Sequence, residues 1–166
     1  MLIVAKFEYF RKGKRRKKRE FTCLCCINYM APEKEAANQR RKNMYPNDLK
    51  YTSTHQWVRV DGNIAVIGIT QYAQEQLGEI VYIDLPRPDD DMTAGEVMGS
   101  VESVKSISDL YTPVSGKVIE INEDLIDEPA KINEDPYASW MVKIEMSAPS
   151  ELNGMLTAVE YQSKLD

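Results

Sequence analysis

The sequence contains few of the residue types from which catalytic and metal sites are usually built. Among its 166 residues there is one histidine, His55, and the three cysteines all lie between positions 23 and 26. Residues 44–166 hold no cysteine, which excludes a disulfide framework and a cysteine zinc site there. A Ser-His-Asp or Cys-His arrangement would depend on His55 alone. We therefore expect no nucleophile–base pair and no metal site, and a structural hydrogen-bonding role for His55.

Long apolar runs are also missing. None reaches the roughly 18 residues that a helix needs to cross a bilayer, and we find neither a phosphate-binding glycine loop nor an internal repeat. Hydrophobic residues make up 43% of the chain and charged residues 28%, which is typical of a soluble globular protein. We expect no association with a membrane.

Acidic residues are scarce in residues 1–43, and basic residues are scarce in residues 44–166. Residues 1–43 carry 13 Lys and Arg against 4 Asp and Glu, whereas residues 44–166 carry 8 against 22. Like charges repel, so we expect 1–43 to be a basic, disordered extension without a selected role. The basic run at 11–19 could bind nucleic acid or an anionic membrane, but we expect neither. Alternatively, Met44 is the natural start.

The first residues match no targeting signal well. Their charge follows the first apolar patch, unlike a secretory signal, and they are lysine-dense and poor in serine, unlike a mitochondrial transit peptide. We expect a cytoplasmic protein, with the mitochondrial matrix as the alternative.

Residues 44–166 read as many short strands separated by Gly, Pro and Asp turns, which indicates an all-β sandwich or flattened barrel. Asp61-Gly62 predicts a tight hairpin turn. In the run 79–85, positions 80, 82 and 84 should face one side and 81, 83 and 85 the other. Residues 86–94 and 123–136 read as connections. The expected strands are 57–60, 64–69, 79–85, 97–104, 107–111, 117–122 and 140–146.

Two helices are expected as accessories. The first is short, near 70–77, with Thr70 as N-cap and Gly78 as C-cap. The second is C-terminal and opens at 149–151 with Ser150 as N-cap. Its apolar face should comprise Leu152, Met155, Leu156 and Val159.

A single lysine, Lys105, lies between two extended runs, 97–104 and 107–111. Period-two alternation on both sides of a short polar centre predicts a hairpin with Lys105 at its tip. Pro113 to Gly116 then supplies a turn. By position alone, such a lysine is a solvated surface charge.

The residues that flank Lys105 indicate a more specific role for it than a surface charge. Residues 102–116, E-S-V-K-S-I-S-D-L-Y-T-P-V-S-G, closely resemble the lipoyl-attachment segment of glycine cleavage system H proteins. Further segments agree with that family in order, and the resemblance covers nearly all of 44–166. It implies the lipoyl/biotinyl-type barrel-sandwich hybrid fold and lipoic acid in amide linkage on Lys105. The residues expected to support the attachment hairpin are Glu102, Ser103, Val104, Ser106, Asp109 and Gly116.

The resemblance implies a carrier rather than an enzyme. In that family the lipoyl arm accepts the aminomethyl group formed by a pyridoxal-phosphate glycine decarboxylase. It delivers the group to a tetrahydrofolate-dependent aminomethyltransferase, and dihydrolipoamide dehydrogenase reoxidises the arm. A lipoate-attaching enzyme is the fourth implied partner. The acidic surface would suit steering toward basic partner surfaces, although it also serves solubility alone.

Three positions depart from the family pattern. Gln56 stands where glutamate is common, and Gln76 where some members have histidine. The resemblance places both in a pocket near the loaded arm. The run 136–140 is one residue shorter than usual and lacks the glycine before tryptophan, so we expect that loop to be reshaped.

Two other carriers remain as alternatives: a biotinyl domain, and an H-like protein that relays lipoyl groups to other complexes. Biotin attachment typically requires methionines beside the lysine, whereas Val104 and Ser106 flank Lys105. A small hydrolase is disfavoured because only one histidine is available.

Overall fold

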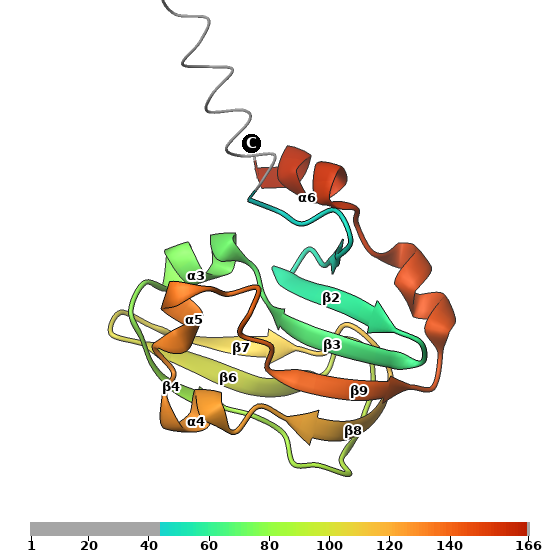
Figure 1. Ribbon diagram of the computed structural model, residues 1–166, viewed down its shortest axis with the longest axis horizontal. Helices are drawn as coiled ribbons and strands as arrows, with labels where there is room; N and C mark the ends of the chain where they lie inside the picture. Colours follow the sequence, from blue (N-terminus) through green and yellow to red (C-terminus); the bar gives the residue numbers. More distant parts are fainter. Residues whose placement is uncertain (1–43, 166) are drawn as a thin grey trace, which may run out of the picture. The chain divides into compact units, whose positions relative to one another are not determined.

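The computed structural model describes residues 44–165, which form a mostly β domain with two antiparallel sheets (Figure 1). Our predictions for residues 1–43 lie outside the described residues. The six-stranded sheet comprises, in spatial order, β1 (Lys50–Tyr51), β2 (Gln56–Asp61), β3 (Ile64–Ile69), β9 (Val142–Met146), β8 (Gly116–Ile121) and β5 (Asp91–Met92). The three-stranded sheet comprises β4 (Ile80–Asp84), β6 (Val97–Ser103) and β7 (Ile107–Tyr111).

Short helices lie between and after these strands. They are α3 (Gln71–Leu77), α4 (Asp124–Asp127), α5 (Lys131–Glu134), the 3₁₀ helix η1 (Pro149–Gly154) and α6 (Ala158–Leu165). Both helices near the expected places are present, and α3 has the predicted caps. The Thr70 hydroxyl accepts from the Ala73 N–H, and Gly78 ends the helix with φ 78°.

The main core is shared by the two sheets. Ile67 of β3 and Ile144 of β9 pack in one cluster with Ile83 of β4 and Val101 of β6, and all four are at least 99% buried. Each such side chain contributes about 1.5–3 kcal/mol when fully buried. This shared core fixes the small sheet, which carries Lys105, relative to the large one.

A second, aromatic cluster attaches the C-terminal helix. The rings of Tyr51 and Tyr161 stack with centroids 4.9 Å apart, and Tyr45 packs edge-on against Tyr161 at 5.3 Å. Trp57 is fully buried in the same cluster, and its indole N–H donates to the Pro136 carbonyl over 3.0 Å. That bond holds the start of the loop 136–140 against β2.

The predicted hairpins are confirmed. β2 and β3 pair from Gln56↔Ile69 to Asp61↔Ile64, with Gly62 in the turn at φ 61°. β6 and β7 pair on either side of Lys105.

The predicted alternation in 79–85 is wrong. A register shift between Ile80 and Tyr82 gives β4 an extra residue, so Val81 and Tyr82 are both exposed while Ile80 and Ile83 are buried. A bulge of this kind restarts the period-two pattern one residue later.

Two stretches expected to be connections contain regular structure. Within 86–94, β5 pairs with β8 at the sheet edge. Within 123–136, α4 and α5 bury Leu125 and Ile132 in the main core. A two-residue strand and four-residue helices are too short for periodicity to detect.

The expected C-terminal helix is also corrected. Residues 149–154 form a 3₁₀ helix that follows Ala148 rather than Ser150, and α6 begins only at Ala158. Between them, Leu156 exchanges two backbone hydrogen bonds with Tyr51, at 2.8 and 2.9 Å. This pairing with a buried residue interrupts the helical pattern. Val159 is consequently 72% exposed, and Tyr161 faces the domain instead.

Candidate functional site

Lys105 is exposed in the tight turn that joins β6 to β7. The Ser103 N–H donates to the Ser106 carbonyl over 2.8 Å and closes the turn. The Ser103 hydroxyl donates to the same carbonyl at 3.0 Å and accepts from the N–H groups of Lys105 and Ser106 at 3.2 and 3.1 Å. A serine can thus satisfy the backbone of a turn that has neither glycine nor proline.

The turn packs against the linker between α3 and β4. The Val104 N–H donates to the Glu79 carbonyl over 3.1 Å, and Ile80 pairs with Ser103. A Cβ on Gly78 would lie 3.6 Å from the Lys105 Nζ. Within the described residues Lys105 forms no salt bridge. Its amine is therefore available to a reagent while its backbone is held in place.

A cavity of about 310 Å³ lies next to this support. Its walls come from α3, from the start of β2 and from β7, the strand that follows the lysine turn. Gln56 and Gln76, which the family resemblance placed near an arm, both line it. Gln56 is 98% buried, whereas Gln76 is exposed. The apolar side chains in the lining are Ile69, Ala73, Leu77, Val101 and Leu110.

Two threonine hydroxyls fix the orientation of the Gln56 side chain. Its oxygen Oε1 accepts from Thr52 at 2.6 Å and from Thr54 at 2.5 Å. Because hydroxyls donate to the oxygen, the Nε2 amide group is the part of Gln56 left for the cavity, and it is a hydrogen-bond donor. A glutamate at this position would present an acceptor instead.

His55 has the structural role expected of it. Its Nδ1 lies 2.7 Å from the Tyr161 hydroxyl, which lies 2.9 Å from the Thr70 hydroxyl. Burial lowers the pKa of His55. A neutral His55 ring can accept a hydrogen bond from the Tyr161 hydroxyl, which in turn accepts from the Thr70 hydroxyl. The Thr70 hydroxyl accepts from the Ala73 N–H, so every group in this network has a partner.

The other residues that were predicted to support the attachment hairpin lie in three different places. Glu102 lies opposite Tyr82 and Ile107 in the three-stranded sheet. Asp109 lines the cavity. Gly116 lies elsewhere, at the start of β8, where it pairs with Met92 and Met146.

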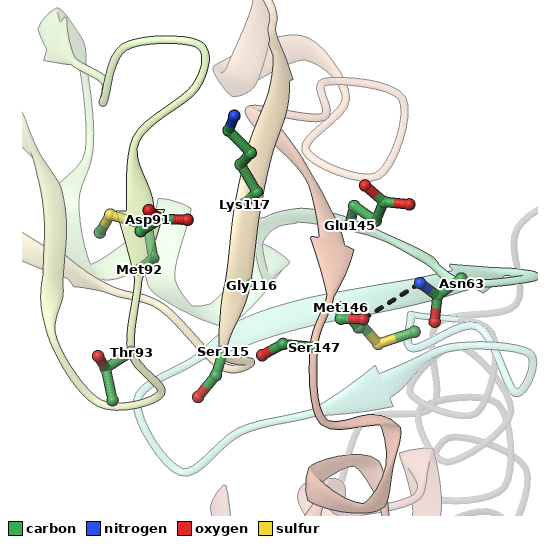
Figure 2. A pocket seen from close by; sticks show the side chains of 10 residues that line it. All are labelled: Asn63, Asp91, Met92, Thr93, Ser115, Gly116, Lys117, Glu145, Met146 and Ser147. Carbon is green, nitrogen blue, oxygen red and sulfur yellow. Dashed lines mark hydrogen bonds between the residues drawn. The ribbon is translucent and has the colours of Figure 1, made fainter.

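Gly116 belongs to a second cavity, of about 460 Å³, shown in Figure 2. β5, β8 and β9 form it, together with Asn63, whose amide donates to the Met146 carbonyl over 3.1 Å. None of the residues 103–106 lines this larger cavity. Any role of Gly116 at the lysine turn is therefore indirect, through the strand that follows the hairpin.

The sequence did not reveal how the lysine turn is supported by the linker between α3 and β4. Gly78, which the sequence identified only as a helix cap, belongs to this linker, and Asn133 bonds to the linker at Gly78 and Ile80. These contacts join residues that are far apart in the sequence, and local patterns do not encode them.

The fold and this site define a class. A β domain that presents one exposed lysine on a hydrogen-bonded turn beside a cavity is suited to be a carrier protein, in which an attached group supplies the chemistry. Within residues 44–165, no group of three His, Cys, Asp or Glu side chains could hold a metal ion, and no helix is long and apolar enough to span a bilayer.

The chain belongs to the glycine cleavage H-protein family, whose model matches residues 49–166. Glycine cleavage system H proteins of Carboxydothermus hydrogenoformans and Staphylococcus epidermidis are 51% and 50% identical to it, over 125 and 121 residues. These spans cover 75% and 72% of this chain and 96% of each relative. The crystal structure of an H protein from Mycobacterium marinum, 38% identical, has a TM-score of 0.67 and covers 72% of this chain and 98% of that one.

Family membership confirms the sequence-based prediction of a lipoyl-bearing shuttle in the glycine cleavage system. The likeness to the solved H protein confirms the mostly β fold class.

Proposed function

We propose that Lys105 is the residue of this carrier that bears lipoic acid, in amide linkage on Nζ. The observation that carries the proposal is its position, exposed at the tip of the β6–β7 hairpin on a turn whose backbone N–H groups, from Ser103 to Ser106, are all hydrogen-bonded. In attachment, the unprotonated amine attacks an activated lipoyl carboxyl group, an amide forms, and the activating group leaves. Acylation also removes the lysine charge.

The residues beside Lys105 fit such an arm. The cavity of about 310 Å³ has an apolar wall for an alkyl chain; its polar groups are the buried Gln56 and the exposed Gln76 and Asp109. When bound, lipoic acid supplies dithiol–disulfide chemistry for the aminomethyl group and for electrons. The residues of the cavity would hold the arm against the domain and limit the access of water to it.

The partners follow from the carrier role. We propose a pyridoxal-phosphate glycine decarboxylase as the donor of the aminomethyl group, a tetrahydrofolate-dependent aminomethyltransferase as its acceptor, and dihydrolipoamide dehydrogenase for reoxidation. A lipoate-attaching enzyme modifies Lys105. An arm attached to a rigid hairpin can enter the active site of each partner enzyme in succession, at a high effective concentration.

The test is the mass of the protein after incubation with lipoate, ATP and a lipoate-attaching enzyme, followed by peptide mapping. We expect one lipoyl group on the peptide that contains Lys105. Lys105→Arg should fold normally and remain unmodified, because arginine keeps the charge but lacks the acylated amine. Lys117→Arg, on β8, is the control and should be modified like the wild type. A lipoyl adduct on Lys105→Arg, or biotin in place of lipoate on protein from the native host, would contradict the proposal.

A further inference from the structure

Asn133 of α5 bridges the linker beneath the lysine turn. Its Nδ2 donates to the Gly78 carbonyl over 2.5 Å, and its Oδ1 accepts from the Ile80 N–H at 3.2 Å. One side chain thus bonds to the residues on both sides of Glu79. The helix that carries it is fixed by Ile132, which is fully buried in the main core.

The bridged linker in turn supports Lys105. The Glu79 carbonyl, between the two residues that Asn133 holds, accepts from the Val104 N–H at 3.1 Å. The linker has two other anchors: the Gly78 N–H donates to the Gln74 carbonyl over 2.8 Å, and Ile80 is buried in the main core. Among residues 44–165, the Gly78 carbonyl accepts, besides Asn133, only from the Gln74 side chain, at 3.4 Å. Gly78 has φ 78° and ψ −133°, a conformation that glycine adopts without strain and that is strained for other residues.

We propose that Asn133 is a positioning residue for Lys105: it holds the linker that fixes the β6–β7 turn, and thereby sets the rate at which an enzyme acylates the lysine. Asn133 reaches Lys105 only through backbone groups. Loss of its amide would leave the Ile80 N–H without its partner and let the linker shift together with the turn. A misplacement of about 1 Å can lower the rate of a reaction that depends on alignment by roughly 100-fold. The inference rests on the proposed acylation of Lys105.

The chain offers a matched control. Asn122 is also half-buried, and its Nδ2 donates to the Trp140 carbonyl over 2.7 Å, a contact that does not involve the turn or its linker. Asn122→Ala removes one side-chain bond to a backbone carbonyl, whereas Asn133→Ala removes one such bond and also the bond from the Ile80 N–H. Both should lower the melting temperature, Asn133→Ala by at least as much as Asn122→Ala. Only the first should affect Lys105. Asn133→Asp is a near-isosteric third variant, which keeps an acceptor for Ile80 but loses the donor to Gly78.

The experiment measures lipoylation of Lys105 by a lipoate-attaching enzyme in the full-length chain, well below each melting temperature. We expect kcat/KM to fall by about 10- to 100-fold for both Asn133→Ala and Asn133→Asp, and not at all for Asn122→Ala. Acetylation of Lys105 by a small N-hydroxysuccinimide ester should be equal in all variants, because it needs no alignment. Amide hydrogen exchange at Val104 should become faster in the two Asn133 variants and remain unchanged in Asn122→Ala.

The outcomes separate the two claims. If the wild type is not lipoylated at Lys105, the proposed function is wrong. If the wild type is lipoylated and Asn133→Ala is lipoylated as fast as Asn122→Ala, the positioning role is wrong. If Asn133→Ala does not fold, Asn133→Asp decides by the same comparison.

Discussion

The Nδ1 atom of His55 lies 2.7 Å from the hydroxyl of Tyr161, so the residue that precedes β2 is joined directly to the C-terminal helix. Tyr161 continues to Thr70, the N-cap of α3, at 2.9 Å. The helix that ends at Gly78 beneath Lys105 is therefore fixed at its start by two residues from distant parts of the chain.

This connection predicts a pH dependence of stability. Because burial lowers the pKa of His55, the unfolded chain binds the proton more readily than the native one. His55 should therefore stabilise the fold fully above its unfolded pKa, near 6.5, and lose that contribution as pH falls through the lower folded value. We expect the melting temperature of the wild type to fall more between about pH 7 and 5 than that of His55→Asn, which tolerates the φ of 67° at this position. Parallel pH profiles for the two proteins would contradict the prediction.

Gly78→Ala should destabilise the domain because of its backbone conformation. Alanine at φ 78° and ψ −133° is strained, and we expect a loss of about 1–3 kcal/mol in the free energy of unfolding. Gly154→Ala is the control, since a Cβ there meets nothing within 4 Å and φ is not positive. Urea denaturation of both variants measures the difference. Equal midpoints would show that the linker tolerates a side chain and that its glycine is not required.

Residues 44–165 contain both hydrophobic clusters. We therefore predict that a chain beginning at Met44 melts within a degree or two of full length and is lipoylated equally well. A chain beginning at Lys50 should be much less stable, because it loses Leu49 and Tyr45, whose ring contacts those of Tyr51 and Tyr161. A large loss on removing residues 1–43 alone would show that they belong to the domain.

The features of the fold that local chemistry encodes could be predicted from the sequence. Asp61-Gly62 and the caps of α3 act within a few residues of themselves, and the alternation around Lys105 is a property of two adjacent strands. The C-terminal helix could not be placed, because pairing between Leu156 and Tyr51 decides where it begins. Likewise the bulge in β4 depends on its register with β6.

The site was predictable only in part. The exposure of Lys105 followed from its position in the hairpin, whereas the meeting of Gln56 and Gln76 at one cavity followed from family resemblance and not from spacing. Asn133 acts across 53 and 55 positions of sequence on Ile80 and Gly78, so its role needed the structure.

The side chain at position 56 should affect the rate at which a loaded arm loses its aminomethyl group. An aminomethyl group on the arm is an amine that carries a positive charge when protonated. With Oε1 occupied by Thr52 and Thr54, Gln56 offers the cavity a donor, which a protonated amine cannot use. In Gln56→Glu the same hydroxyls would hold one carboxylate oxygen and leave the other as an acceptor. An ion pair about 4 Å apart gains roughly 1 kcal/mol even at the dielectric constant of water.

We therefore expect Gln56→Glu to slow the spontaneous loss of the aminomethyl group about fivefold, which corresponds to that energy. The measurement follows the loaded protein by mass spectrometry without transferase or folate. Gln76→Glu is the control: residue 76 lines the same cavity but is exposed, so its charge is screened by water and salt and should have a smaller effect. Asp109 already places an exposed carboxylate at the cavity, and the wild-type rate includes its contribution. Equal decay of wild type and Gln56→Glu, or faster decay of the variant, would mean that the arm does not lie against residue 56.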